Sequence, residues 1–202
     1  MAWQKDHKQK TREKILNSGA KLFTLKGFDK VGINDVMADA GLTRGAFYSH
    51  FASKSELYAE SMRVAGARRA KNILSRSPEE SSAALRALVN GYLSQGHRNS
   101  EDGGCPLAFL VTDIAQQDEQ VRDVYTEVFR GFMDMLSSRL IHPETGQASE
   151  IRVQARKTEA MQKTVMMVGG MAIARALNDD DLAEELLNAC REGMLQGIPA
   201  TA

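Results

Sequence analysis

Residues 33–58, INDVMADAGLTRGAFYSHFASKSELY, constrain the fold more than any other part of the chain. They contain two short helical patterns, and Gly41 separates them at a place where a helix end often needs a positive φ. Thr43 is expected to cap the second helix through its hydroxyl group. Phe47 and Phe51 are four residues apart, so they share a face that can pack against the first helix. The pattern predicts a helix, a tight turn and a second helix around one small core.

The opposite face of the second predicted helix is polar. It offers hydrogen-bonding groups and little apolar area to bury, which indicates a polar partner. Ser53 and Glu56 then form an S-x-x-E capping box that starts a third helix. The box places Lys54 in the first helical turn, where the helix dipole does not favour a cation. A bound phosphate would account for a lysine at this position. The polar face comprises Thr43, Arg44, Ala46, Tyr48, Ser49 and His50.

This segment resembles the TetR family of bacterial transcriptional regulators. The family typically has Gly, an aliphatic residue, Ser or Thr, a basic or small residue, Gly, a small residue, an aromatic residue and Tyr. Two variable positions, Phe and x-Ser/Asn-Lys-x-x-Leu follow. Residues 41–51, GLTRGAFYSHF, match this pattern, as do Ser53, Lys54 and Leu57. The resemblance implies a helix-turn-helix that binds a double-stranded DNA operator through Thr43, Arg44, Gly45, Ala46, Tyr48, Ser49, His50 and Lys54.

Within this resemblance, residues 44–50 would lie as a helix in the major groove. Arg44 is the residue expected to contact a base, guanine in particular, because its guanidinium pairs with the groove edge of guanine. Thr43, Tyr48, His50 and Lys54 would position the head on phosphates. The sequence departs from the family just before the motif.

The family usually opens the preceding helix with Thr-Ser or Thr-Thr, whereas this chain has Val31 and Gly32. Glycine is a tolerable N-cap but has no side chain to reach a phosphate. By the same resemblance, Lys8, Lys10 and Arg12 of the first helix could contact the DNA backbone. Solvated lysines are the alternative interpretation.

Composition favours an all-α protein. Of 202 residues, 43% are hydrophobic and 26% charged, which is ordinary for a soluble globular protein. Only 6% are aromatic, and no stretch alternates apolar and polar residues with β-branched enrichment. The N-terminus is hydrophilic, and no apolar run approaches the roughly 20 residues that span a bilayer. We therefore expect a cytoplasmic protein without a membrane segment, and Cys105 and Cys190 do not suggest a disulfide framework.

Charge is divided unevenly along a chain whose formal net charge is zero. Residues 1–55 contain ten Lys and Arg against five Asp and Glu, so this part carries +5 and the remainder −5. A basic head on an acidic body suits a protein that binds DNA at one end. A mere bias in solvated charge is the alternative. We predict a DNA-binding domain over residues 1–53 and a helical ligand-binding and dimerisation domain over residues 54–202.

Helical periodicity continues to the end of the chain. A further helix is expected from Pro106, with an apolar stripe of Leu107, Leu110, Val111 and Ile114, and residues 142–149, HPETGQAS, are expected to form a loop. The other predicted helices cover about residues 7–26, 53–76, from the Ser77-Pro78 start signal to 96, 118–141, 149–177 and 179–196.

Cys105 follows Gly103 and Gly104 and precedes Pro106, which predicts that its thiol lies at or beside a helix N-cap. A helix dipole there favours thiolate over thiol, so Cys105 is a candidate sensor of electrophiles or oxidants. A subset of the resembling regulators carries Gly-Cys at this place, and some of these respond to such compounds. A small buried residue that packs beside two glycines is the alternative interpretation.

Seven of the ten methionines lie between residues 133 and 194, which suits either an adaptable apolar pocket or ordinary core packing. Leu110, Tyr125, Phe129 and Met166 are the candidate pocket residues for a small apolar or electrophilic effector. No His, Cys or carboxylate cluster has metal-ligand spacing, and there is no phosphate-binding glycine loop. No cofactor, metal or catalytic activity is therefore expected.

In the resembling family the last two helices pair with those of a second copy, so the resemblance implies a homodimer. Gly169 and Gly170 would permit close helix approach, either between copies or within one chain. We therefore expect a homodimeric regulator, a repressor in our interpretation, released from a palindromic operator by a ligand or by thiol modification. The alternative is a thiol-based enzyme or small-molecule carrier on a helical body, although Cys105 has no evident neighbouring base in the sequence.

Overall fold

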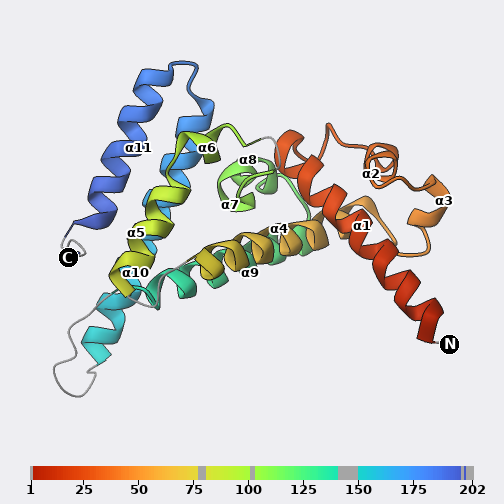
Figure 1. Ribbon diagram of the computed structural model, residues 1–202, viewed down its shortest axis with the longest axis horizontal. Coiled ribbons are helices and arrows are strands. Elements are labelled where there is room, and N and C mark those ends of the chain that lie inside the picture. The colour runs from red at the N-terminus through yellow and green to blue at the C-terminus, as the bar shows by residue number, and fades with distance from the viewer. Residues whose placement is uncertain (1, 77–80, 101–102, 141–149, 197, 199–202) are drawn as a thin grey trace. The chain divides into compact units, whose positions relative to one another are not determined.

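The structure is a computed structural model that describes residues 2–76, 81–100, 103–140, 150–196 and 198. These residues form eleven helices and no strand, so the predicted all-α fold with an N-terminal helix-turn-helix head is confirmed (Figure 1). None of the described helices is long and apolar enough to cross a membrane. The helices are α1 Ala2–Lys26, α2 Ile33–Asp39, α3 Arg44–Phe47, α4 Lys54–Arg76, α5 Ser81–Tyr92, α6 Gln95–Arg98, α7 Pro106–Phe109, α8 Val111–Ile114, α9 Glu119–Ser137, α10 Glu150–Ala176 and α11 Asp180–Leu195.

Most boundaries agree with the periodicity, with three differences near helix ends. The helix expected to reach about residue 141 ends at Ser137, because the Arg139 N–H donates to the Leu136 carbonyl three residues earlier (3.0 Å) in a tighter turn. The first helix begins at Ala2 instead of residue 7, because no proline or glycine interrupts residues 2–6. The helix expected to reach residue 96 ends at Tyr92, since the hydroxyl of Ser94 accepts a hydrogen bond from the His97 backbone N–H and starts α6. The Ser77-Pro78 start signal and the predicted loop at residues 142–149 lie outside the described residues.

The chain divides into two compact units. Unit 1 contains Met1–Arg69 and Glu101–Val128, and unit 2 contains Ala70–Ser100 and Phe129–Ala202. The boundary predicted between residues 53 and 54 falls within unit 1, and the division into domains at that point stays a prediction. Residues 101–128, which contain Cys105, thus belong to the same unit as the helix-turn-helix.

Unit 1 has one apolar core, to which the head and residues 101–128 both contribute. Leu110, between α7 and α8, Ile114 of α8, and Val121 and Val124 of α9 are buried together with residues of the first four helices. The buried members from the first four helices include Ile15, Phe23, Val36, Met37, Phe47, Phe51, Leu57, Tyr58 and Met62. Because these side chains form one cluster, α7, α8 and the first part of α9 support the head directly.

The predicted helix from Pro106 is broken at Leu110, which is a correction to the continuous stripe inferred from sequence. The Leu110 N–H donates to the Pro106 carbonyl (3.1 Å) and closes α7, while the Leu110 carbonyl accepts from the Ile114 N–H (2.9 Å) within α8. Leu110 has φ −118°, outside helical geometry. As a result Val111 is 40% exposed although Leu107, Leu110 and Ile114 are buried.

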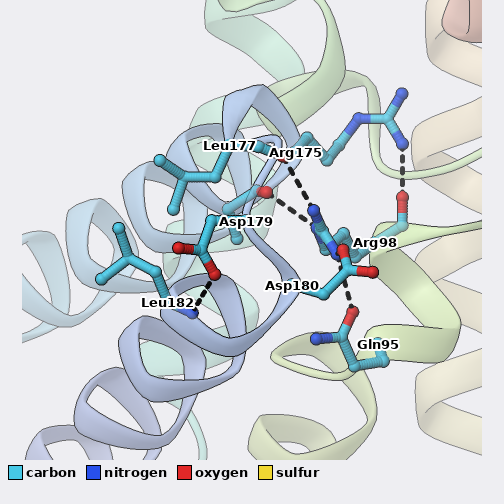
Figure 2. Close-up of polar contacts among 8 residues, drawn as sticks. Gln95, Arg98, Arg175, Leu177, Asp179, Asp180 and Leu182 are labelled. Atoms are coloured by element: carbon cyan, nitrogen blue, oxygen red, sulfur yellow. Dashed lines mark hydrogen bonds and ion pairs between the residues drawn. The ribbon is translucent and has the colours of Figure 1, made fainter.

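In unit 2 a buried arginine holds α6 to the C-terminal end of α10 (Figure 2). Arg98 Nε donates to the Ala174 carbonyl (2.8 Å) and Nη2 to the Leu177 carbonyl (2.9 Å), groups that have no donor within the helix. Its Nη1 also donates to Asp180 Oδ1 (2.6 Å), and Arg175 donates to the Arg98 carbonyl (2.6 Å). Arg98 therefore fixes the turn between the last two helices.

The last two helices pack closely within the chain. A methyl group added at Gly170 would lie 2.6 Å from Cys190 Sγ on α11, so Gly170 permits close approach between α10 and α11. A methyl group at Gly169 would meet nothing within 4 Å. Of the two glycines, Gly170 thus matches the interpretation of an intrachain contact.

Candidate nucleic-acid interface

The turn between α2 and α3 has the geometry expected for its sequence. Gly41 has φ 68°, which favours glycine, and its N–H donates to the Ala38 carbonyl (3.0 Å). The Leu42 N–H donates to the Met37 carbonyl (2.8 Å). These two bonds form a Schellman motif, which satisfies the last carbonyls of α2 and turns the chain sharply.

The start of α2 uses a glycine N-cap. Gly32 has extended backbone geometry, and the Asp35 carboxylate accepts a hydrogen bond from its N–H (2.7 Å). The Asp35 side chain thus reaches back to the backbone of the N-cap residue. In an ordinary cap, the serine or threonine side chain instead accepts from a backbone N–H further along the helix. The cap is formed without any side chain at Gly32 that could reach a phosphate.

The second helix of the motif, α3, is shorter than expected. It covers Arg44–Phe47 rather than residues 44–50, and the Thr43 hydroxyl makes no capping hydrogen bond. The Ser49 and His50 N–H groups donate to the carbonyls three residues earlier, at 3.3 Å and 2.9 Å, so the chain continues as tighter turns. Gly45 has a low helix propensity, and Phe47 is the buried residue of α3, so little stabilises a longer α-helix here.

The inner face of this segment packs as predicted. Phe47 is fully buried and Phe51 is 2% exposed, and their ring centroids are 5.8 Å apart. The Arg12 guanidinium of α1 lies 4.8 Å from the centre of the Phe51 ring. A cation in this position interacts favourably with the aromatic face, so α1 braces the motif from behind.

The outer face is exposed and polar. Tyr48 is 60% exposed, and its ring meets the buried Phe47 ring edge to face at a centroid distance of 5.1 Å. Because the inner ring is fixed in the core, the exposed phenol is held in a defined position. Thr43, Arg44, Gly45 and Ser49 are exposed, while Ala46 and His50 are half-buried.

The start of α4 has the predicted Ser53 cap, since the Ser53 hydroxyl accepts from the Glu56 N–H (3.0 Å). The Glu56 carboxylate accepts from the Ala52 N–H (2.6 Å), one residue before the position that a capping box uses. Lys54 Nζ lies 4.0 Å from the centre of the Phe28 ring. This cation–π contact accounts for part of the lysine's placement in the first turn, and a phosphate contact by Lys54 stays a prediction.

His50 stands next to two cations. Burial is the main cause that lowers its pKa from the ordinary 6.5, and the positive charges of Lys8 and Arg12 lower it further. Its Nδ1 is buried without a hydrogen-bond partner among the described residues. The imidazole is therefore disposed to be neutral near pH 7 and to gain a proton if an anion approaches.

We expect operator affinity to increase as the pH falls from about 7.5 to 6, because a phosphate beside His50 would raise its pKa and couple binding to proton uptake. Folding has the opposite dependence: the lowered pKa stabilises the fold above pH 6.5, and this contribution is lost as the pH falls. Fluorescence-anisotropy titrations across this range should show the affinity change for wild type and a smaller one for His50→Gln. Equal pH profiles would remove His50 from the phosphate contacts.

Cys105 is the N-cap of α7 and Pro106 occupies the first helical position, as predicted. The thiol is 3% exposed, and α7 has only four residues, so the helix-dipole argument for a thiolate carries little weight. Burial is the main cause that raises the pKa of Tyr125 to about 12. The Tyr125 hydroxyl donates to the Leu107 carbonyl (2.8 Å), which joins α9 to α7 beside the cysteine.

The candidate ligand-pocket residues belong to different units. Leu110 is buried and Tyr125 half-buried in unit 1, whereas Phe129 is half-buried and Met166 is 36% exposed in unit 2. The four-residue pocket stays a prediction.

Sequence reasoning missed two residues beside the head, Phe28 and Asp113. The Asp113 carboxylate accepts hydrogen bonds from the Phe28 N–H and the Tyr58 hydroxyl. The available signals were an aromatic residue directly after the helix-ending Gly27 and a single acid within the apolar segment LAFLVTDIA.

Comparisons with known proteins cover both units. The family model for bacterial regulatory proteins of the tetR family matches residues 15–61, and that for the tetracyclin repressor-like C-terminal domain matches residues 81–190. The uncharacterized HTH-type transcriptional regulator YxaF of Bacillus subtilis is 28% identical over 144 residues, 69% of this chain and 74% of YxaF. The HTH-type transcriptional repressor NemR of Escherichia coli is 25% identical over 133 residues, 64% of this chain and 67% of NemR.

Solved structures share the fold. The reduced form of E. coli NemR matches with a TM-score of 0.75 and 20% identity, covering 96% of this chain and 100% of that chain. A TetR family regulator from Agrobacterium tumefaciens matches with a TM-score of 0.72 and 21% identity, with the same coverage.

Proposed function

Because this chain belongs to the tetR family of bacterial regulatory proteins and is a DNA-binding transcriptional regulator, we propose that it is a repressor of a palindromic operator. The observation that supports this most is the exposed polar face around Arg44 and Tyr48, backed by the buried Phe47 and Phe51. The name of the similar NemR, a transcriptional repressor, favours repression over activation. A protein with this role acts in the cytoplasm and needs no catalytic step.

Arg44 is the proposed base-reading residue. It begins α3, its side chain is exposed, and Gly45 beside it allows the backbone to approach the DNA closely. Thr43, Tyr48, His50 and Lys54 would hold phosphates, and Ala46 and Ser49 complete the surface that faces the groove.

The protein would bind as a homodimer through α10 and α11. Large apolar side chains are exposed on these two helices, and in water they favour burial against a second copy. Two heads related by a two-fold axis would then read half-sites about one helical turn, ~34–36 Å, apart. The exposed apolar residues are Val153, Met161, Val165, Met166, Ile173 and Leu182.

The operator proposal is tested by titrating the purified protein with DNA from upstream of its own gene and with scrambled DNA, at two salt concentrations. Tight binding to the upstream fragment alone, weakening steeply with salt, is the expected result because phosphate contacts release counterions. Equal affinity for both DNAs would contradict specific regulation at that site.

Release would follow from a small apolar or electrophilic effector, or from modification of Cys105. Such a signal shifts the equilibrium only if it has a higher affinity for the released form than for the DNA-bound form. Cys105 is buried at the start of α7, so a group added to its sulfur would displace packed neighbours.

For the thiol mechanism, we expect an alkylating agent or oxidant to abolish operator binding by wild type and to leave Cys105→Ser bound. Cys190→Ser is the matched control, because Cys190 is the second thiol and lies on α11, in unit 2. If both variants release DNA as wild type does, Cys105 has no part in release.

A further inference from the structure

Asp113 lies where residues 101–128 meet the DNA-binding head. It is on α8, eight residues after Cys105, and its carboxylate has one donor just after α1 and one on α4. The Phe28 N–H lies 3.2 Å from Oδ1 and 3.3 Å from Oδ2. The Tyr58 hydroxyl of α4 donates to Oδ2. One side chain therefore ties α8 both to the end of α1 and to α4.

The Phe28 bond controls the segment that leads into the helix-turn-helix. The Phe28 carbonyl accepts from the N–H of the buried Val31 (3.4 Å), and the next residue, Gly32, is the N-cap of α2. Two hydrogen bonds, Asp113 to Phe28 and Phe28 to Val31, thus connect the Asp113 carboxylate to the residue before the N-cap of α2. A displacement of Asp113 would move the start of α2.

The Tyr58 bond is set within an aromatic cluster. The Tyr58 ring lies 4.9 Å from the Phe23 ring and 5.2 Å from the Phe28 ring, centroid to centroid. Lys54, one turn earlier on α4, places its ammonium 4.0 Å above Phe28. Asp113 therefore also fixes the ring on which a proposed phosphate-binding lysine rests.

The backbone at this junction is built for close approach. Gly27 has φ 79°, and a methyl group added there would lie 3.2 Å from Asp113 Oδ1. Gly103 has φ 86°, and a methyl group there would lie 3.4 Å from the Cα of Lys21 on α1. Residues 103–114 are thus held against α1 at both ends of the segment.

From this geometry we propose that Asp113 is a positioning residue for DNA reading, which holds the start of α2 and the Lys54–Phe28 pair in register with α7 and α8. Its role in release rests on the proposed function: a change at Cys105 would shift α7 and, through Leu110, the helix that carries Asp113. Asp113 itself contacts no DNA in this assignment.

The first measurement needs no DNA. In hydrogen exchange of the free full-length protein, Asp113→Ala should raise exchange of amides 28–42 by about tenfold or more, the expected effect of losing the hydrogen bonds to Phe28 and Tyr58. Exchange in α11 should be unchanged. Asp123→Ala removes an equally negative, exposed residue of unit 1 and should match wild type. Unchanged exchange of residues 28–42 in Asp113→Ala would overturn the proposal.

Asp113→Asn separates hydrogen bonding from charge. Asparagine keeps an acceptor for the Phe28 N–H and can donate to the Tyr58 oxygen, so we expect near wild-type exchange. Exchange as fast as in Asp113→Ala would show that the hydrogen bonds to Phe28 and Tyr58 do not hold residues 28–42, and would overturn the positioning role. Tyr58→Phe removes one donor to Asp113 and leaves the Phe28 bond. This milder variant serves if Asp113→Ala does not fold. Faster exchange of residues 28–42 in Tyr58→Phe then supports the proposal, and unchanged exchange overturns it.

The second measurement compares operator and scrambled DNA. Asp113→Ala should lower the affinity for operator about tenfold more than the affinity for scrambled DNA, because base contacts need more exact placement of α3 than phosphate contacts. Equal loss on both DNAs would indicate a merely structural role. If wild type itself shows no preference, the operator proposal fails, and the exchange measurement still decides the role of Asp113.

Discussion

Arg44→Ala is expected to weaken operator binding by about 1–3 kcal/mol for each half-site and to broaden the base preference at the position that Arg44 reads. Arg44 is exposed at the start of α3, and no ion pair holds its guanidinium within the described part of the chain. Its removal therefore costs the fold little, and the loss falls on the DNA contact. Titration against operator and single-base variants of it measures both effects.

Two controls make the Arg44 result specific. Arg122→Ala removes an exposed cation from α9 and should change operator affinity only slightly. Arg44→Lys keeps the charge but loses the planar fork that pairs with guanine, so it should recover salt-dependent affinity without recovering base preference. If Arg44→Ala keeps the wild-type base preference, base reading belongs to another residue of the polar face.

Much of the fold could be predicted from local patterns in the sequence. Gly41 ends α2 with the positive φ that its position implied, and Ser53 caps α4. These features depend on a few neighbouring residues and on helix-end chemistry, which the sequence states directly. The pairing of Phe47 with Phe51 was predictable for the same reason.

The contacts that the sequence could not predict depend on distant residues. The break at Leu110 interrupts an apolar stripe that fits one helix, because the tertiary core favours two short helices instead. The Asp113–Phe28 bond joins residues 85 apart in sequence, and the Lys54–Phe28 contact also depends on folding. The DNA contacts of the polar face stay predictions, since the structure shows exposure and position but contains no DNA.

Cys105 belongs to the same compact unit as the helix-turn-helix, which bears on the proposed mechanism of release. Cys105 was placed by sequence in the body, yet residues 101–128 share the core of the head. Under the proposed thiol mechanism, a signal at Cys105 would therefore act within unit 1, where buried side chains and the Asp113 hydrogen bonds connect it to α2. A change of packing at Cys105 could therefore reach the polar face of α3 through contacts within unit 1 alone.

Phe47→Ala is expected to lower the free energy of unfolding by about 3–5 kcal/mol, as is typical when a fully buried aromatic ring is removed from a core. Its ring contacts both Phe51 and Tyr48, so the cavity would lie directly beneath α3. Because domains are stable by only about 5–15 kcal/mol, operator binding should be lost together with the head's structure. Urea unfolding followed by circular dichroism and a DNA titration measure the two losses.

The neighbouring Tyr48→Ala variant tests whether the two faces of α3 have separate roles. Tyr48 is 60% exposed, so its removal should cost less than about 1.5 kcal/mol of stability, mainly the edge-to-face contact with Phe47. It should nevertheless weaken DNA binding, because its phenol would position the head on a phosphate. Wild-type DNA affinity in a folded Tyr48→Ala protein would move the phosphate contacts away from this face. If Tyr48→Ala lowered the free energy of unfolding as much as Phe47→Ala does, the exposed ring would instead be part of the core.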